Sequence, residues 1–275
     1  MVTKVAVVTG SNKGIGYAIV RGLCKRFEGV VYLTSRDESR GQHAIQQLAK
    51  EGLQPKYHQL DITSVKSVEK FRDYIKSQYG GIDILVNNAA IAFKTNAKEP
   101  VAVQAEQTLL VNYFSLLSTC EILFPILQNG ARVVNISSSC GHLSLIPSVA
   151  LRNKLQDPNL TIQELSQLMQ DFIDGARKGT HAAKWGNSSY VVSKVGVTAL
   201  SKIQQRMYND RDIKVNAVHP GYVDTDMSSH KGPLTTDEGA AAPLFLALDA
   251  ADSVRGQYVW CDSRIVSWDG QQPEG

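Results

Sequence analysis

The sequence has few cysteines, and none are arranged as a metal site or a disulfide framework. Cys24, Cys120, Cys140 and Cys261 lie far apart, with no C-x-x-C pair and no histidine at metal-ligand spacing. Free thiols in a reducing compartment are the expected state of cysteines in this pattern. We therefore expect no bound metal and a cytoplasmic location.

The chain also lacks a strong charge of one sign. Lys and Arg number 29 against 26 Asp and Glu, and no basic tract occurs, so charge gives no support to a nucleic-acid partner. The strand-like residues Val5 to Val8 follow the first methionine so closely that we expect no signal peptide. We identify no apolar stretch that approaches the roughly 20 residues of a membrane span, and expect no membrane partner.

What the sequence does contain is a regular alternation of short β-branched runs and amphipathic segments. We expect strands at 4–9, 30–34, 56–60, 83–86, 131–137, 214–218 and 257–260, and helices at 14–27, 38–50, 65–78, 106–127, 189–208 and 238–248. Such alternation indicates β-α-β units, whose right-handed crossovers place helices on both faces of a parallel sheet. The sequence thus predicts one domain over residues 1–275 with a doubly wound, Rossmann-type α/β fold, ending in a loose tail at 262–275.

Residues 141–188 interrupt the alternation. Thr161-Ile162-Gln163-Glu164 has the form of a capping box, in which Thr161 and Glu164 satisfy backbone donors at a helix start. Apolar residues then recur at helical spacing, at Ile162, Leu165, Leu168, Met169, Phe172 and Ile173. We expect an inserted, partly helical segment that packs on the domain as a surface excursion, or as a cover for the substrate cleft or an interface.

A glycine-rich turn follows the first expected strand. Glycines at such a turn let the backbone approach a pyrophosphate, and the helix behind them presents free N–H groups to an anion. Three glycines alone also occur in ordinary tight turns, but their place between the first strand and first helix favours a dinucleotide. The expected binding residues of this turn are Gly10, Ser11, Asn12, Lys13, Gly14, Ile15 and Gly16.

The end of the second expected strand indicates which dinucleotide binds. An NAD site usually has an acidic residue there, whereas this chain has Ser35 and Arg36, with Lys13 and Arg40 nearby. Cations suit a 2′-phosphate, so NADP(H) is favoured over NAD(H). A solvated surface charge is a reasonable alternative for Arg40, and a weaker one for Lys13 and Arg36 together.

Polar residues also gather where the reaction would occur. Tyr190 and Lys194 are four residues apart and share a helix face, so we expect the ammonium to lower the pKa of the phenol. Ser138 follows the fifth expected strand, and Asn87-Asn88 follow the fourth, at the edge where ligands of such sheets bind. Asn112 lies in an otherwise apolar helix, where a locally satisfied kink is the alternative to a functional role.

Taken together, these motifs resemble the short-chain dehydrogenase/reductase family. The resemblance rests on T-G-x-x-x-G-I-G, N-N-A, the helical Asn, the strand-five Ser, Y-x-x-x-K and Pro220-Gly221, in the right order along nearly the whole chain. The insertion, together with the runs at 12–16, 79–83 and 221–227, is similar to the NADPH-dependent carbonyl reductases of animal cytosol. The resemblance implies NADPH as cofactor, a small carbonyl compound as substrate, and a monomer.

The resemblance also implies a role for each matching residue. Tyr190 would be the general acid, Lys194 would lower its pKa and hold the nicotinamide ribose, Ser138 would bind the substrate oxygen, and Asn112 would position a water. The other residues implied to hold the cofactor are Asp61 and Ile62 at the adenine end, Asn88, and, around the nicotinamide, Pro220, Val223 and Thr225.

The chain departs from the family pattern at two places. Ala90 stands where N-N-A-G is usual, and His219 stands before Pro220, either as a polar wall of the pocket or behind it. The candidate substrate-pocket residues besides Ser138 and Tyr190 are Cys140, Trp185, Tyr222 and Met227, each with plain packing as its alternative. Carbonyl reduction of quinones, aryl ketones or aldehydes is the leading function; NADP-linked alcohol oxidation and a catalytically silent NADPH sensor are the other two hypotheses.

Overall fold

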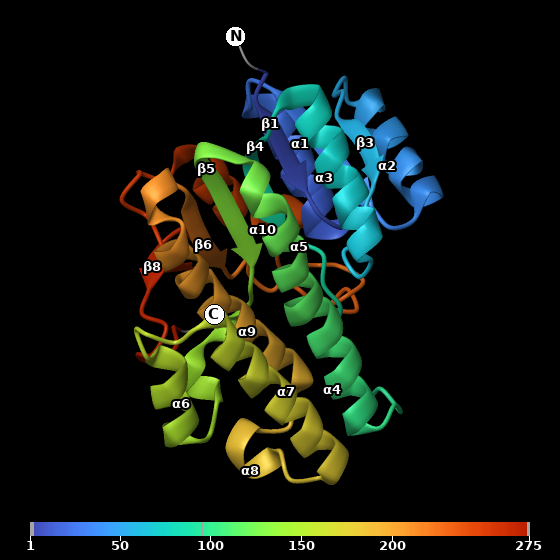
Figure 1. Cartoon of the computed structure of the whole chain (residues 1–275). Coiled ribbons are helices and arrows are strands. Elements are labelled where there is room, and N and C mark those ends of the chain that lie inside the picture. The colour runs from blue at the N-terminus through green and yellow to red at the C-terminus, as the bar shows by residue number, and fades with distance from the viewer. Residues whose placement is uncertain (1–2, 95, 274–275) are drawn as a thin grey trace.

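The computed structural model of the chain describes residues 3–94 and 96–273, and in it one β-sheet forms the centre of the molecule (Figure 1). Its strand order is β3-β2-β1-β4-β5-β6-β7-β8, in which all neighbours are parallel except the final pair β7 and β8. The strand order reverses between β1 and β4. The strands are β1 Val5–Val8, β2 Val30–Ser35, β3 Lys56–Gln59, β4 Ile82–Asn87, β5 Leu127–Ile136, β6 Lys214–Val218, β7 Tyr258–Val259 and β8 Ile265–Val266.

Helices cover both faces of this sheet, as the alternation predicts. Successive residues of a strand point to opposite faces, so Val5 and Val7 join one apolar core while Ala6 and Val8 join the other. The first core includes α3 (Val65–Tyr79), α4 (Val101–Leu109), α5 (Leu116–Leu123) and α9 (Ser189–Met207); the second includes α1 (Gly14–Arg26), α2 (Glu38–Lys50) and α10 (Thr236–Leu244). The doubly wound α/β fold is thereby confirmed.

The helical stretch Val101–Ile126 is longer and more apolar than our reading of the sequence allowed. It is 26 residues long, and an 18-residue window within it has a mean hydropathy of 1.6, enough by length and composition alone to cross a membrane. The expectation that no apolar stretch approaches that length is therefore wrong. The stretch is largely buried, however, with α4 packed against α9 and α5 against α3. A π-helical turn, Leu110–Ser115, separates α4 from α5 where a single helix was expected.

The insertion forms α6 (Val149–Gln156), α7 (Ile162–Lys178) and α8 (Ala182–Trp185). The capping box at Thr161 and Glu164 is confirmed, because each side chain accepts from the other's backbone N–H. The apolar face of α7 packs against α4 and α9, and all three lie side by side in Figure 1. Met169 sits so close to Gly196 that a Cβ there would lie 2.7 Å from its sulfur. The insertion is therefore a covering layer and belongs to the fold.

The end of the chain is not the loose tail expected for 262–275. β8 pairs with β7, and Trp268 is buried with its indole N–H donating to the carbonyl of Gly141 at 2.7 Å. The backbone N–H of Leu143 in turn donates to the carbonyl of Trp268 at 3.0 Å. These contacts tie the chain end to the start of the insertion. Residues 274–275 of the expected tail lie outside the described part.

Candidate active site

The crevice of an open α/β sheet lies at the carboxyl ends of the strands where their order reverses, here between β1 and β4. The glycine turn leaves β1 at this point. Gly10 has φ +60°, and a Cβ there would lie 2.8 Å from Ala89, so a side chain would collide with the residue after β4. Gly14 also has φ +60° and opens α1, whose first turn presents unpaired N–H groups. The turn therefore has the backbone cradle that an anionic group requires.

Two polar side chains among the expected cofactor residues hold this turn in shape. The Ser11 hydroxyl is fully buried and donates to the carbonyl of Val8 at 2.8 Å, which fixes the path of the chain after β1. The Asn88 amide donates to the carbonyls of Thr9 and Gly10, both at 3.0 Å. A Cβ on Gly16 would lie 2.4 Å from the same amide nitrogen. Asn88 thus couples the end of β4 to the glycine turn.

The remaining residues expected near the cofactor surround the same crevice. Arg36 and Arg40 are exposed beyond β2, and Arg40 lies 3.9 Å from Asp37, the N-cap of α2. One carboxylate oxygen of Asp61 accepts from the backbone and hydroxyl of Thr63. The residues Asn12, Ile15 and Ile62 are half-buried beside the turn and beyond β3, while Pro220 and Val223 are buried and Thr225 is half-buried after β6.

Tyr190 and Lys194 occupy one face of α9, as their spacing predicts. The Lys194 nitrogen lies 5.6 Å from the centre of the Tyr190 ring and donates to the carbonyl of Ile136, at the end of β5, at 2.8 Å. The lysine side chain is 3% exposed, which means that the ammonium is held behind the phenol and away from solvent. The two groups are therefore fixed by α9 and by the carboxyl end of β5.

The expectation that the ammonium lowers the Tyr190 pKa is wrong for the protein by itself. Burial raises the pKa of Tyr190, and the Ser138 hydroxyl opposes this effect only in part. Burial also lowers the pKa of Lys194 to about 8. Desolvation disfavours the charged form of each group. At neutral pH the pair therefore consists of a neutral phenol and an ammonium, and the ammonium is lost as the pH rises through about 8.

Ser138 follows β5, and Asn112 contacts α9, the helix that carries this pair. Ser138 caps the short turn Ser139–Gly141 by accepting from the backbone of Cys140 at 3.2 Å, which leaves its hydroxyl hydrogen available as a donor. Asn112 lies in the π-helical turn, where its amide exchanges two hydrogen bonds with the backbone of Ile91 and donates to Ser193 at 3.1 Å. The side chain of Asn112 is thus locally satisfied, and it anchors the segment after β4 to α9.

The candidate pocket residues divide into two groups. The Met227 sulfur lies 4.0 Å from the Tyr190 hydroxyl, and Tyr222 is 53% exposed on the same segment. Cys140 is half-buried next to Ser138, and burial raises the pKa of its thiol. Trp185, in contrast, is buried against Phe172 with ring centres 5.9 Å apart. Trp185 thus packs in the core of the insertion.

His219 lies behind the segment after β6 and does not act as a charged group. Its ring stacks edge-on against Trp260 at 4.4 Å, and its Nδ1 accepts from the backbone of Gly221 at 3.3 Å. Burial lowers the pKa of His219 to about 4, so the ring is neutral at physiological pH. The histidine thus supports the turn at Gly221, where φ is +95°.

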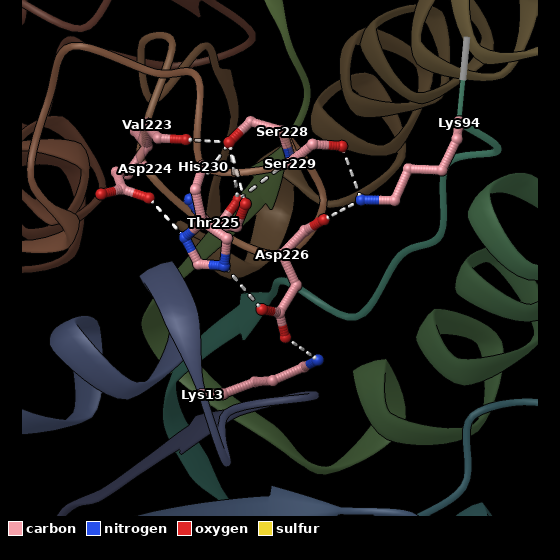
Figure 2. Close-up of polar contacts among 9 residues, drawn as sticks. All are labelled: Lys13, Lys94, Val223, Asp224, Thr225, Asp226, Ser228, Ser229 and His230. Carbon is pink, nitrogen blue, oxygen red and sulfur yellow. Dashed lines mark hydrogen bonds and ion pairs between the residues drawn. The ribbon is translucent and has the colours of Figure 1, made fainter. Parts of the chain in front are cut away.

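The sequence did not reveal three further charged or titratable residues that gather around Lys13 at this site, namely Lys94, Asp226 and His230. Asp226 accepts from Lys13 at 2.5 Å and from His230 at 3.1 Å, and Lys94 donates to the Asp226 carbonyl and, at 2.8 Å, to Ser229 (Figure 2). These residues come from three segments that are far apart in the chain. No spacing rule connects such positions, so only the folded arrangement could identify them.

Comparisons with known proteins agree with this geometry. A family model described as short chain dehydrogenase matches residues 4–150 and 178–234, and the gap between them falls inside the insertion. The chain is 46% identical over 272 residues to carbonyl reductase (NADPH) 1 of Rattus norvegicus and 44% identical over 272 residues to that of Homo sapiens. Both matches cover 96% of this chain and 98% of the relative.

Solved structures show the same fold. Salutaridine reductase from Papaver somniferum is 28% identical with a TM-score of 0.85, covering 93% of this chain and 99% of that one. The NADPH-bound carbonyl reductase from chicken fatty liver is 23% identical with a TM-score of 0.71, covering 97% of this chain and 99% of that one. At that lower identity the similarity concerns the fold.

Proposed function

This chain belongs to the short chain dehydrogenase family, and from that premise we propose that it reduces small carbonyl compounds with NADPH, using Tyr190 as the general acid. The observation that carries the proposal is the meeting of Tyr190, Lys194 and Ser138 at the carboxyl edge of the sheet. A phenol, an ammonium and a hydroxyl are there fixed beside a crevice lined by a glycine turn. A binding module would have no use for all three.

The residues around the crevice suit NADPH. Gly10 and Gly14 form a cradle that a Cβ would fill or strain, and α1 begins behind them with no acidic residue in its first turn. Lys13 and Arg36 are exposed cations near the end where a 2′-phosphate would lie. NADPH supplies the hydride of the reduction when it is bound. Lys194 would hold the nicotinamide ribose, and Pro220, Val223 and Thr225 would support the ring.

Within this proposal the protein's own groups perform the proton transfer. Hydride adds to the carbonyl carbon, the C=O π bond breaks, and the Tyr190 hydroxyl gives its proton to the oxygen. Ser138 donates a hydrogen bond to the same oxygen as negative charge develops there. A raised pKa keeps Tyr190 protonated before the reaction. Solvent then returns the proton to the tyrosinate, which the Lys194 ammonium stabilises.

Asn112 contributes indirectly to the return of the proton to Tyr190, by positioning a backbone carbonyl. Because its amide is already bonded to Ile91 and Ser193, a water in the relay would bind a main-chain carbonyl of the π-helical turn. Such turns leave carbonyl groups outside the regular i→i−4 pattern. The proposed role of Asn112 is thus to stabilise the π-helical turn whose main-chain carbonyl binds the water.

The proposed substrates are small molecules with an apolar, preferably planar group beside the carbonyl, such as quinones, aryl ketones and aldehydes. The Met227 thioether contacts the Tyr190 hydroxyl, Cys140 is half-buried two residues after Ser138, and Tyr222 is exposed on the segment that carries Met227. Prostaglandin and steroid ketones are further candidates of the same chemistry.

Loss of nicotinamide absorbance with purified protein and a quinone or aryl ketone tests the function. We expect turnover with NADPH and far slower turnover with NADH, because the cations favour a 2′-phosphate. Tight NADPH binding without reduction would contradict the proposal. Formation of NADPH from NADP⁺ and an alcohol would then indicate alcohol oxidation as the function, and inactivity in both directions would indicate a sensor.

We also propose that the protein is a monomer, because α7 covers the faces of α4 and α9 that would otherwise be exposed. Tyr113 meets Ser166 of α7 at 3.0 Å, and Glu106 pairs with Arg177 at 3.1 Å at the other end of the contact. An apolar helix face that is already packed is not available to a second copy. Light scattering should give the mass of one chain at micromolar concentration, and a stable dimer mass would refute the monomer.

A further inference from the structure

The segment that follows β6 crosses the crevice. Along the sheet, β4 and β5 lie between β6 and β1, yet Asp226 in this segment reaches Lys13 in the turn after β1 at 2.5 Å. Thr225 lies at the same crossing, where a Cβ on Gly14 would come within 3.5 Å of its methyl group. Figure 2 shows the Asp226 carboxylate pointing at the Lys13 ammonium. The ion pair therefore spans the reversal point of the sheet, where the cofactor is proposed to bind.

The crossing segment presents Asp226 from a fixed position. The Ser228 hydroxyl donates to the carbonyl of Val223 at 2.7 Å and accepts from the backbone of Thr225 at 3.1 Å. The backbone N–H of His230 donates to the Thr225 carbonyl at 2.9 Å. These bonds make residues 223–230 a closed turn. The direction of Asp226 toward Lys13 is thus set by the segment and does not depend on the ion pair alone.

The Asp226 carboxylate is shared between two partners, Lys13 and His230, which makes its hold on Lys13 easy to displace. His230 lies between Asp226 at 3.1 Å and Asp224 at 2.6 Å, and the hydrogen bond to Asp224 raises its pKa. Lys13 and Asp226 are themselves 60% and 61% exposed, so water and salt screen their attraction. A doubly charged phosphate with three acceptor oxygens is a stronger partner for Lys13 than this carboxylate.

We propose that Asp226 is a specificity-determining residue for the cofactor, which competes with the 2′-phosphate of NADPH for Lys13. The inference rests on the proposed function, because it takes NADPH as the cofactor and Lys13 as a phosphate ligand. Binding of NADPH transfers Lys13 from the carboxylate to the phosphate, while NADH leaves the ion pair in place. Asp226 therefore reduces the preference that Lys13 and Arg36 would otherwise give. Arg36 has no ion pair among the described residues, so it meets the phosphate without a competitor.

Binding of each cofactor to Asp226→Asn, measured by calorimetry without substrate, tests the competition. Asparagine preserves the shape of the side chain and removes its charge. We expect the NADPH dissociation constant to fall by about two- to fivefold, the range of an exposed ion pair, and that of NADH to stay unchanged. Asp73→Asn is the matched control, because it removes an exposed carboxylate that pairs with Arg72 on α3 and not with Lys13 or His230. It should leave both constants unchanged.

A variant that lacks the Lys13 ammonium separates competition for Lys13 from other effects of Asp226. In Lys13→Gln, the further change Asp226→Asn should no longer affect NADPH binding. An effect of Asp226→Asn that persists in the Lys13→Gln protein would overturn the competition, and so would equal changes in the dissociation constants of NADPH and NADH. Weaker NADPH binding in the single variant Asp226→Asn would also overturn it, and would show instead that the ion pair closes over the bound cofactor. A wild-type protein that binds neither cofactor would refute the proposed function as well, whereas one that binds NADPH with no change in Asp226→Asn refutes only this inference.

Discussion

Replacing Tyr190 with phenylalanine should reduce carbonyl reduction by about 100- to 10,000-fold, the range that a positioned general acid contributes. The substitution removes one oxygen from a ring whose place is fixed by α9, so the crevice and Lys194 stay as they are. NADPH binding should therefore change little. Turnover of a quinone at saturating NADPH gives the first quantity, and a calorimetric titration with NADPH gives the second.

Tyr208→Phe provides the control for this experiment. Tyr208 ends the same helix and packs edge-on against Phe124 at 5.0 Å, remote from the strand ends that hold Lys194. Its variant should keep wild-type turnover. Full activity in Tyr190→Phe would remove the proposed acid, and loss of NADPH binding would mean that the phenol hydroxyl serves the cofactor rather than the proton transfer.

The position of Tyr190 could be predicted from the sequence, whereas its ionisation could not. Helical periodicity alone places residues four apart on one face, which is why Tyr190 and Lys194 meet. The pKa of the phenol depends on how far the site excludes water. Burial is a property of the whole fold, so no local pattern could show that desolvation raises the pKa of Tyr190.

The distinction between local patterns and long-range burial also explains which parts of the fold could be predicted. Strands and helices that alternate over short distances were predictable because each one carries its own periodicity. The burial of Trp268, in the expected tail at 262–275, was not predictable because it is created by Gly141, far away along the chain. The side-chain hydrogen bonds of Ser11 were not predictable for a similar reason, since its partners include the carbonyl of Thr34 on β2. Pairwise contacts of this kind leave no signal in spacing or composition.

Neutralising Lys13 and Arg36 together, as Lys13→Gln with Arg36→Gln, should weaken NADPH binding by about 100-fold and NADH binding by less than about threefold. Charge-assisted hydrogen bonds to a phosphate are the strong ones, and two exposed cations at about tenfold each give this size. NADH has a ribose hydroxyl at the same place, which needs neither charge. Dissociation constants for both cofactors, measured at one fixed ionic strength, give the comparison directly.

The single variants make this prediction sharper, because the structure treats the two cations differently. Lys13 must break its ion pair with Asp226 to bind a phosphate, whereas Arg36 is displaced only from water. Arg36→Gln should therefore weaken NADPH binding more than Lys13→Gln does. Removing Asp226 as well should bring the two costs closer together. Lys50→Gln, at the far end of α2, is the neutral control. Equal losses for NADPH and NADH in the double variant would mean that neither cation recognises the 2′-phosphate, and the cofactor preference would have to arise elsewhere.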